Sequence, residues 1–361
     1  MMNTKEQELS QRVGNVQYYY GTTLSSKEDL VTNVCTVDES PSDEIKAILK
    51  TVHPDVQKRF YGCGTPFPPL LTGSTVLDLG CGSGRDCFVL SKLVGQEGRV
   101  IGIDTTFEQI EFAKSHIEYH RDVYGYNESN VHFIHGNIES LDQLDLPSNS
   151  VDIIVSNCVI NLAAAKFDVL QGIFQLLKPG GEIYFADIFS DRRLSPALKN
   201  DPLLIGECIG DVLYYGDFVK VARNAGFRDI RVVSSHLKTI DNKPIEEKLG
   251  GAKLYSMTLR LFKIDLEESC EDYGQVAIYK GNLPGSPARF MLDQEHVFET
   301  GKAVPICRNT ADIICKSRYH SLFSVIGEGH THFGIFNCGT ASNSFSASNE
   351  VSMCAPSGCS W

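Results

Sequence analysis

The chain has 361 residues, of which 42% are hydrophobic and 22% charged, a globular composition with room for one large domain and a smaller one. Its formal net charge of −12 and its lack of a basic stripe argue against nucleic acid as a partner, so a small cofactor or substrate is expected. The N-terminus lacks a signal-peptide core, and the most apolar run, 151–165, is too short and too interrupted to span a membrane. We therefore expect a cytoplasmic protein with no membrane partner, whose twelve cysteines are mostly free thiols.

Strands and helices are predicted to alternate after a polar N-terminal segment. Residues 1–41 lack clear periodicity, and a helical pattern begins at Ser42 with apolar residues at i, i+3, i+4 and i+7. Strands are expected at 75–79, 100–103, 131–135, 151–156 and 182–187, and helices at 86–94, 107–124 and 167–177. This alternation predicts an α/β fold with a doubly wound, mainly parallel Rossmann-like sheet.

A glycine-rich loop follows the first predicted strand and opens the next helix, in the order Leu77-Asp78-Leu79-Gly80-Cys81-Gly82-Ser83-Gly84. Glycines at alternate positions let the backbone approach a ligand closely, and the helix N-terminus then faces that ligand. The spacing G-x-G-x-G after an acid suits a cofactor that carries an amino acid rather than a pyrophosphate. Asp104 ends the second strand, where a carboxylate accepts the ribose hydroxyls of a nucleoside. A nucleoside cofactor is therefore predicted.

With the segments 136–139 and 177–181, these motifs resemble the class I methyltransferase superfamily, which implies S-adenosyl-L-methionine as the cofactor. The resemblance assigns cofactor contacts to single positions in three groups. These are Asp78, Gly80, Gly82 and Gly84 around the methionine part, Asp104 with Thr105 at the ribose, and Ile138 with Glu139 flanking the adenine.

Four further segments, 60–64, 156–162, 190–193 and 206–210, resemble the arsenite methyltransferase family over about residues 30–335. The resemblance implies methylation of trivalent arsenic, as arsenite or methylarsenite, in arsenic biotransformation and detoxification. It implies Cys63, Cys158 and Cys208 as the arsenic ligands. It also links Cys35 to a redox step that regenerates trivalent arsenic through a disulfide, with glutathione or a thioredoxin system as the thiol reductant.

The chemistry of arsenic supports this ligand set independently. Trivalent arsenic is soft and prefers thiolates to imidazole or carboxylate. Three sulfurs in a pyramid leave its lone pair free to attack a sulfonium methyl group. Cys158 lies just beyond the end of a predicted strand, where open α/β sheets bind their ligands. Since the leaving group is a neutral thioether, catalysis is expected to depend mainly on positioning.

The other cysteines are interpreted as packing or tail residues. Cys81 and Cys87 lie in and after the glycine loop. Cys270, Cys307 and Cys315 show no ligand spacing, and Cys338, Cys354 and Cys359 fall in a tail rich in Ser and Asn.

Four parts of the chain are expected. They are an arm at 1–41 carrying Cys35, a cofactor-binding methyltransferase domain at 42–235, an α+β domain at 236–336 that closes the metalloid site, and a tail at 337–361.

Two other functions remain open at this stage. A methyltransferase for a small organic acceptor explains the cofactor motifs but leaves Cys63, Cys158 and Cys208 as coincidences. A non-enzymatic protein that binds metalloids through thiolates explains the cysteines but leaves Asp78 and Asp104 without a role.

Overall fold

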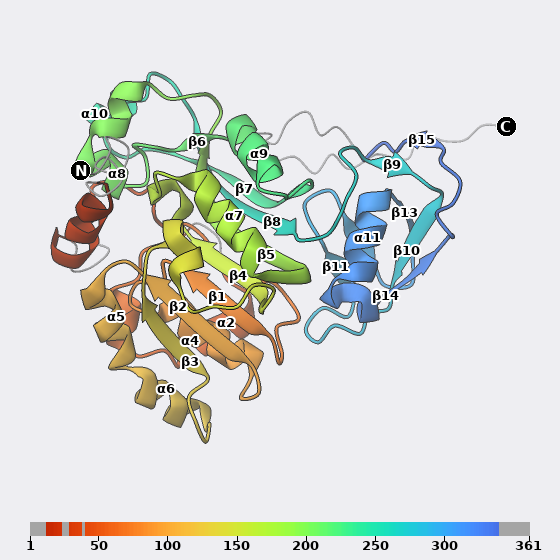
Figure 1. Cartoon of the computed structure of the whole chain (residues 1–361), viewed down its shortest axis with the longest axis horizontal. Coiled ribbons are helices and arrows are strands. Elements are labelled where there is room, and N and C mark those ends of the chain that lie inside the picture. Colours follow the sequence, from red (N-terminus) through yellow and green to blue (C-terminus); the bar gives the residue numbers. More distant parts are fainter. Residues whose placement is uncertain (1–11, 24–28, 38–39, 339–361) are drawn as a thin grey trace, which may run out of the picture.

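The computed structural model describes residues 12–23, 29–37 and 40–338. Within them, a mixed sheet of eight strands has the order β3-β2-β1-β4-β5-β8-β7, with β6 paired to the end of β5 (Figure 1). The first five strands are parallel, whereas β8 runs antiparallel to both β5 and β7. The bounds are β1 Thr75–Leu79, β2 Arg99–Asp104, β3 Val131–His135, β4 Val151–Asn157, β5 Leu177–Ser190, β6 Leu213–Tyr214, β7 Ile230–Lys238 and β8 Leu254–Phe262. The predicted, mainly parallel Rossmann-like sheet is confirmed.

Each face of the sheet packs against its own helices, because successive side chains of a strand point to opposite faces. On β1, Val76 joins the apolar layer under α4 and α5, and Leu77 joins the layer under α7 and α9. The helices are α2 Asp43–Leu49, α3 Pro54–Lys58, α4 Arg85–Val94, α5 Phe107–Lys114, α6 Ile117–Tyr124, α7 Lys166–Leu176 and α9 Tyr215–Asn224.

The single helix predicted over 107–124 is divided into α5 and α6. The Ser115 hydroxyl donates to the Phe112 carbonyl at 2.7 Å, and His116 leaves helical torsions with φ −106°. A serine that bonds its own helix in this way favours a helix end over a helix interior.

Short helices collect at the carboxyl ends of the parallel strands. They are η3 Ile138–Gln143, η4 Ile160–Leu162, η5 Pro196–Asn200, α8 Pro202–Gly206 and α10 Lys243–Lys248, together with helical residues 12–18 and η1 Tyr19–Thr23. An apolar cluster joins residues of the 194–212 segment to Val34, Cys35 and Cys158. The segment 190–215 therefore covers this end of the sheet.

A second, smaller unit follows the sheet, with its own apolar core between Phe262 and Phe323. Helix α11 packs against a three-stranded sheet in the order β13-β10-β14, beside two short two-stranded sheets (Figure 1). The elements are β9 Glu271–Asp272, β10 Gln275–Tyr279, β11 Arg289–Met291, β12 Val297–Glu299, β13 Ala303–Ile306, α11 Arg308–Lys316, η6 Arg318–Leu322, β14 Phe323–Ile326 and β15 Gly334–Ile335.

The predicted domain boundary after residue 235 is wrong, because it falls inside β7. Strand β8 pairs with β5 along its whole length and is buried at all nine positions, so the large sheet extends to Phe262. A strand buried on both faces carries no alternating pattern, which explains why 254–262 was not placed in the sheet from the sequence. Of the predicted tail, only 337 and 338 are described; Cys354 and Cys359 lie outside the described residues. None of the helices in the described ranges has the length and apolar character needed to cross a membrane.

Candidate active site

A cavity of about 1040 Å³, including its mouth, opens at the carboxyl ends of β1, β2 and β4. Of the eight residues predicted to contact the cofactor, seven line it: Asp78, Gly80, Gly82, Asp104, Thr105, Ile138 and Glu139. Two of the four candidate thiols, Cys35 and Cys158, line the same cavity. The topology thus brings the glycine loop and two cysteines from distant segments into one space.

The glycine loop has the shape that the motif predicts. Gly80 has φ +70°, and a Cβ atom there would lie 2.4 Å from Val159, so only glycine fits. Gly84, the eighth predicted contact, does not line the cavity. It caps α4 with φ +85° and its α-carbon faces Phe133 at a distance that excludes a side chain.

Two buried carboxyl groups flank the loop. Asp78 accepts a hydrogen bond from the Cys87 thiol at 3.2 Å, and burial together with the charge of Asp86 raises the pKa of Asp78 to about 8. Asp104 accepts from the backbone N–H groups of Gly82 at 2.9 Å and Thr106 at 2.8 Å. Burial raises the pKa of Asp104 despite these bonds. A cationic ligand, or one with hydroxyl groups, would therefore stabilise the ionised form of both carboxyl groups.

Free acceptors in the cavity wall support the fit of a nucleoside cofactor. The Gln109 Oε1 and Glu139 Oε2 atoms are buried and have no hydrogen-bond partner in the described structure. The other Glu139 oxygen accepts from the Ala164 N–H at 2.8 Å. Because a buried acceptor without a partner costs free energy, these two atoms call for donors such as hydroxyl or amino groups.

The N-terminal segment, interpreted from the sequence as an arm, covers the cavity. Val13, Val16 and Tyr20 line the wall. The Gln17 side-chain amide donates to the Thr105 carbonyl at 2.7 Å. The Gln109 amide donates to the Tyr20 carbonyl at 3.1 Å. The apolar spacing of Val13, Val16 and Tyr20 was the available signal, since such a pattern indicates a helix with one buried face.

Three thiols meet at the inner end of the cavity. The sulfurs of Cys35, Cys158 and Cys208 lie within 4.8 Å of one another, and Cys35 Sγ is 3.7 Å from Cys158 Sγ. Cys63, a predicted ligand, is outside this group but belongs to the same buried cluster of side chains. We call Cys35, Cys158 and Cys208 the inner thiol group.

Two of these cysteines have an unusual backbone. Cys158 has φ 61° and Cys208 has φ 59°, in the left-handed region that non-glycine residues seldom occupy. The Cys158 N–H donates to the Ala186 carbonyl at 2.8 Å, and the Cys208 thiol lies 3.3 Å from the Cys158 carbonyl. Such torsions persist only where surrounding contacts hold them, and they concentrate at functional sites.

Glu207, which is 0% exposed, ties the N-terminal segment to the segment that carries Cys208. Its carboxylate accepts from Tyr19 Oη at 2.6 Å, Val31 N at 2.8 Å, Thr32 N at 2.9 Å and Thr32 Oγ1 at 2.6 Å. Three of these bonds fix residues 31–32 close to Cys35, and the fourth fixes Tyr19. Glu207 is part of the matched segment 206–210, but no role for it was predicted.

Asn157 positions the loop of Cys63 in a similar way. Its side-chain oxygen accepts from the backbone N–H groups of Cys63 at 3.0 Å and Gly64 at 3.2 Å, and its amide donates to the Gly64 carbonyl at 2.9 Å. Asn157 immediately precedes Cys158, so one strand end fixes both thiols.

The surroundings shift the pKa values of these thiols in opposite directions. Hydrogen bonds from Cys158 and Cys35, with a further one from Tyr20, hold the pKa of Cys208 well below its usual value. Burial and the bonds to Cys208 and Cys35 raise the pKa of Cys158 well above its usual value. Burial also raises the pKa of Cys63. Cys208 is therefore the thiol of this group that ionises most readily.

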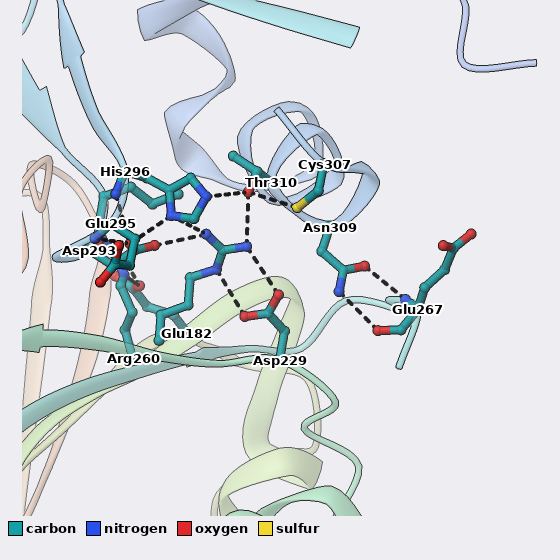
Figure 2. Close-up of polar contacts among 12 residues, drawn as sticks. Glu182, Asp229, Arg260, Glu267, Asp293, Glu295, His296, Cys307, Asn309 and Thr310 are labelled. Atoms are coloured by element: carbon teal, nitrogen blue, oxygen red, sulfur yellow. Dashed lines mark hydrogen bonds and ion pairs between the residues drawn. The ribbon is translucent and has the colours of Figure 1, made fainter. Parts of the chain in front are cut away.

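Only the first residues of the predicted 236–336 domain pack around the thiols. Ile245, Leu249 and Leu254 belong to the apolar cluster that contains them, and the Ser256 hydroxyl donates to the Cys63 carbonyl at 2.8 Å. None of the described residues beyond 163 lines the cavity, and the smaller C-terminal unit contributes no residue to the thiol cluster. The unit attaches near the opposite end of β5, where Glu182 bonds Arg260 and Arg318 (Figures 1 and 2). Because ligands of such a sheet bind at the carboxyl ends, a unit fixed near the amino end of β5 cannot cover them.

Two family models match the chain: a methyltransferase domain over residues 70–240 and an arsenite methyltransferase C-terminal domain over 272–355. An arsenite methyltransferase of Aquipseudomonas alcaligenes is 48% identical over 90% of this chain and 94% of its own length. The human arsenite methyltransferase is 41% identical over 87% of this chain and 84% of its own.

One solved structure is similar over most of the chain. It is an arsenic (III) S-adenosylmethionine methyltransferase from Chlamydomonas reinhardtii, with a TM-score of 0.80 and 43% identity. The match covers 82% of this chain and all of that one.

Proposed function

The chain belongs to the arsenite methyltransferase family, and we propose that it methylates trivalent arsenic held by the thiols around Cys158, with S-adenosyl-L-methionine as methyl donor. The observation that carries this proposal is the shared cavity. Asp78, Asp104 and Glu139 line one part of it, and Cys35 and Cys158 line another. A methyl donor bound at the first part and arsenic at the second would lie in one enclosed space.

Arsenic binding needs no separate base. Arsenous acid exchanges its three hydroxyl groups for three sulfurs, and each hydroxyl leaves as water with a thiol proton. Cys208 provides the first sulfur, because its thiol ionises most readily and thiolates rather than thiols are the nucleophiles. Its proton leaves with the first hydroxyl, and Cys158 and Cys35 then supply their own protons to the second and third. The left-handed torsions of Cys158 and Cys208 hold two ligands in place before arsenic arrives.

The described geometry offers a second candidate for the third sulfur. The prediction groups Cys63 with Cys158 and Cys208, whereas the described geometry groups Cys35 with them. We propose that Cys158 and Cys208 bind arsenic until the methyl group has been transferred, and that Cys35 and Cys63 alternate as the third sulfur. Exchange of this kind frees Cys35 for the redox step.

The protein residues position the donor. When bound, S-adenosyl-L-methionine supplies a methyl group on a cationic sulfur, which the arsenic lone pair accepts without proton transfer. Ionised Asp78 would bind the donor's amino group, Asp104 its ribose hydroxyls, and Glu139 a donor from the adenine side. The segment around Val13, Val16 and Tyr20 excludes water above them.

Methyl transfer raises arsenic formally from the trivalent to the pentavalent state, so two electrons must return. Two thiolates supply them by forming a disulfide. Cys35 and Cys158 are suited to this because their sulfurs are 3.7 Å apart. A thiol reductant, glutathione or a thioredoxin system, would then reopen the bond. All ten cysteines in the described ranges are free thiols, and we propose that the protein works in a reducing compartment such as the cytoplasm.

Transfer of labelled methyl groups from S-adenosyl-L-methionine to arsenite, with excess thiol, tests the proposal. Wild type should form methylated arsenic, and Cys158→Ser should lose this by more than about 100-fold while it still binds the donor, since even residues that only orient a metal ligand contribute 10- to 100-fold. Cys315→Ser, at an exposed thiol outside the group, is the matched control. Donor binding by wild type without methylation of arsenic would instead favour a small organic acceptor.

A further inference from the structure

A second group of three thiols lies in the C-terminal unit, where the sequence shows no ligand spacing. The sulfurs of Cys270, Cys307 and Cys338 lie within 4.8 Å of one another. Cys307 is 0% exposed, and the other two are half-buried. We call these three cysteines the outer thiol group. None of them lines the donor cavity, and Figure 1 shows the strands β9 and β15 beside them far from α8 and α10.

Main-chain pairing brings two of these thiols together. Cys270 directly precedes β9, and Cys338 follows β15 by three positions. These strands pair antiparallel, with Ile335 opposite Glu271, and the Phe336 N–H donates to the Cys270 carbonyl at 2.8 Å. The sequence separates the two cysteines by most of the unit, which is why spacing could not group them.

The third thiol is held at the start of α11. Cys307 is the N-cap of this helix, where the positive end of the helix dipole stabilises a thiolate. Asn309, in the same turn, exchanges two hydrogen bonds of 2.9 Å with the backbone of Glu267 (Figure 2). This pair fixes the segment leading to Cys270 against the helix.

A buried cation also favours negative charge on Cys307. The Arg231 guanidinium donates to Thr310 Oγ1 at 3.0 Å, so the hydroxyl proton of Thr310 is available to the Cys307 sulfur at 3.3 Å (Figure 2). His296 Nε2 lies 3.4 Å from the same hydroxyl. The buried Arg231 thus favours negative charge on the Cys307 sulfur through the Thr310 hydroxyl group. A cysteine that only fills space in a core has no need of such a contact.

We infer that the outer thiol group is a second binding site for trivalent arsenic, remote from the methyl donor, in which the three sulfurs of Cys270, Cys307 and Cys338 bind arsenite, or two of them bind a monomethylated arsenical. Three sulfurs without a fourth His, Cys, Asp or Glu in the described group match the pyramidal geometry of arsenic. Structural zinc takes four ligands. Hydroxyl groups of the arsenical leave as water with the thiol protons, so no oxidant or reductant is required. The inference rests on the proposed function for the identity of the ligand.

Arsenic stoichiometry tests the inference on the full, reduced chain. Protein is incubated with arsenite, freed of unbound arsenic by gel filtration and measured by mass spectrometry of the element, with sulfur coordination read from X-ray absorption. Wild type should retain two arsenic atoms per chain, each with sulfur ligands. Cys307→Ser and Cys158→Ser should each retain one, and Cys315→Ser, in the same helix as the control, should retain two.

Other outcomes separate the two hypotheses. One arsenic in wild type, unchanged in Cys307→Ser and lost in Cys158→Ser, would overturn the outer site and keep the proposed function. One arsenic lost in Cys307→Ser but kept in Cys158→Ser would support the outer site and overturn the proposed one. One zinc per chain in the purified protein, lost in Cys307→Ser, would overturn arsenic as the occupant.

A second variant tests whether the loss of arsenic comes from a missing sulfur or from misfolding. Cys338 is half-buried and lies at the edge of the unit, so Cys338→Ser should keep the wild-type circular dichroism and unfolding temperature. It should still lose one arsenic atom per chain. Retention of both atoms in this folded variant would contradict the three-sulfur site.

Discussion

The two thiol groups use the same atoms in different surroundings. The inner thiol group is buried, includes two cysteines with left-handed torsions and adjoins the donor cavity. In the outer thiol group, Cys270 and Cys338 are half-buried and Cys307 is buried. Cys307 is a helix N-cap with ordinary torsions and has a buried arginine nearby. Affinity for a soft element comes from the three sulfurs, which both groups have. Catalysis depends on what lies next to them, and only the inner thiol group has the donor cavity.

The most direct test of whether only the inner thiol group takes part in catalysis is to remove one sulfur from each group and measure methyl transfer. Cys208→Ser should lower the rate by more than about 100-fold, because it removes a ligand and the thiol that ionises most readily. Cys338→Ser should keep at least about half of the wild-type rate at saturating arsenite, because its sulfur is remote from the cavity. Equal losses in both variants would show that the outer thiol group takes part in turnover.

A stability measurement tests the cation beside the outer thiol group. Arg231 bonds the partly buried Asp229 at 2.9 and 3.0 Å and the buried Asp293 at 2.8 Å. Arg231→Met leaves these carboxylates buried without their partner, so the free energy of unfolding should fall by about 3–5 kcal/mol. Denaturant unfolding checks this.

The exposed arginine of β11 provides the control for that measurement. Arg289→Met should change the free energy of unfolding by less than about 0.5 kcal/mol, as surface substitutions usually do. A loss under about 1 kcal/mol for Arg231→Met would mean that its carboxylates relax into water, because exposed ion pairs contribute only that much.

Glu207 offers a test of how the inner thiol group is assembled. In Glu207→Gln, an amide N–H₂ faces donors that now bond a carboxylate oxygen, so the hold on Val31 and Thr32 weakens. The KM for arsenite should rise about 10- to 100-fold, as for residues that orient metal ligands. Alkylation of Cys35, now 4% exposed, should become faster.

The alkylation rate distinguishes positioning from general destabilisation. Cys307, at 0% exposed in the other unit, should keep its wild-type alkylation rate in Glu207→Gln. Faster labelling of both thiols would point to loss of global stability, and a wild-type rate at Cys35 would contradict the role of Glu207.

The sequence predicted the parts of this comparison that depend on local pattern. Alternating strands, the glycine loop and Asp104 follow from periodicity and from torsions that only glycine adopts, and the resemblance named all four cysteines that meet near Cys158. Position along the sheet was not predictable in the same way. Strand β8 is buried on both faces and shows no alternation, so its place beside β5 and the true extent of the sheet were missed. Cys270 and Cys338 meet through main-chain pairing of two-residue strands, which leaves no pattern in the sequence.

The smallest expected effect concerns the charge near the inner thiol group. The outer thiol group has Arg231 nearby with its partners Asp229 and Asp293, whereas the inner one adjoins a cavity that gains a cation only when the donor binds. Asp78, with its pKa raised to about 8, is protonated over much of the neutral range in the free protein. A cationic donor favours the ionised carboxylate, so binding should release a proton below pH 8. The association constant for S-adenosyl-L-methionine should therefore rise with pH by up to about tenfold per unit and level off above pH 8.

Titration calorimetry from pH 6 to 9, in buffers of different ionisation enthalpy, measures both the affinity and the number of protons released. Asp78→Asn should bind more weakly with a flat profile, and an equally flat profile in wild type would mean that Asp78 is already ionised.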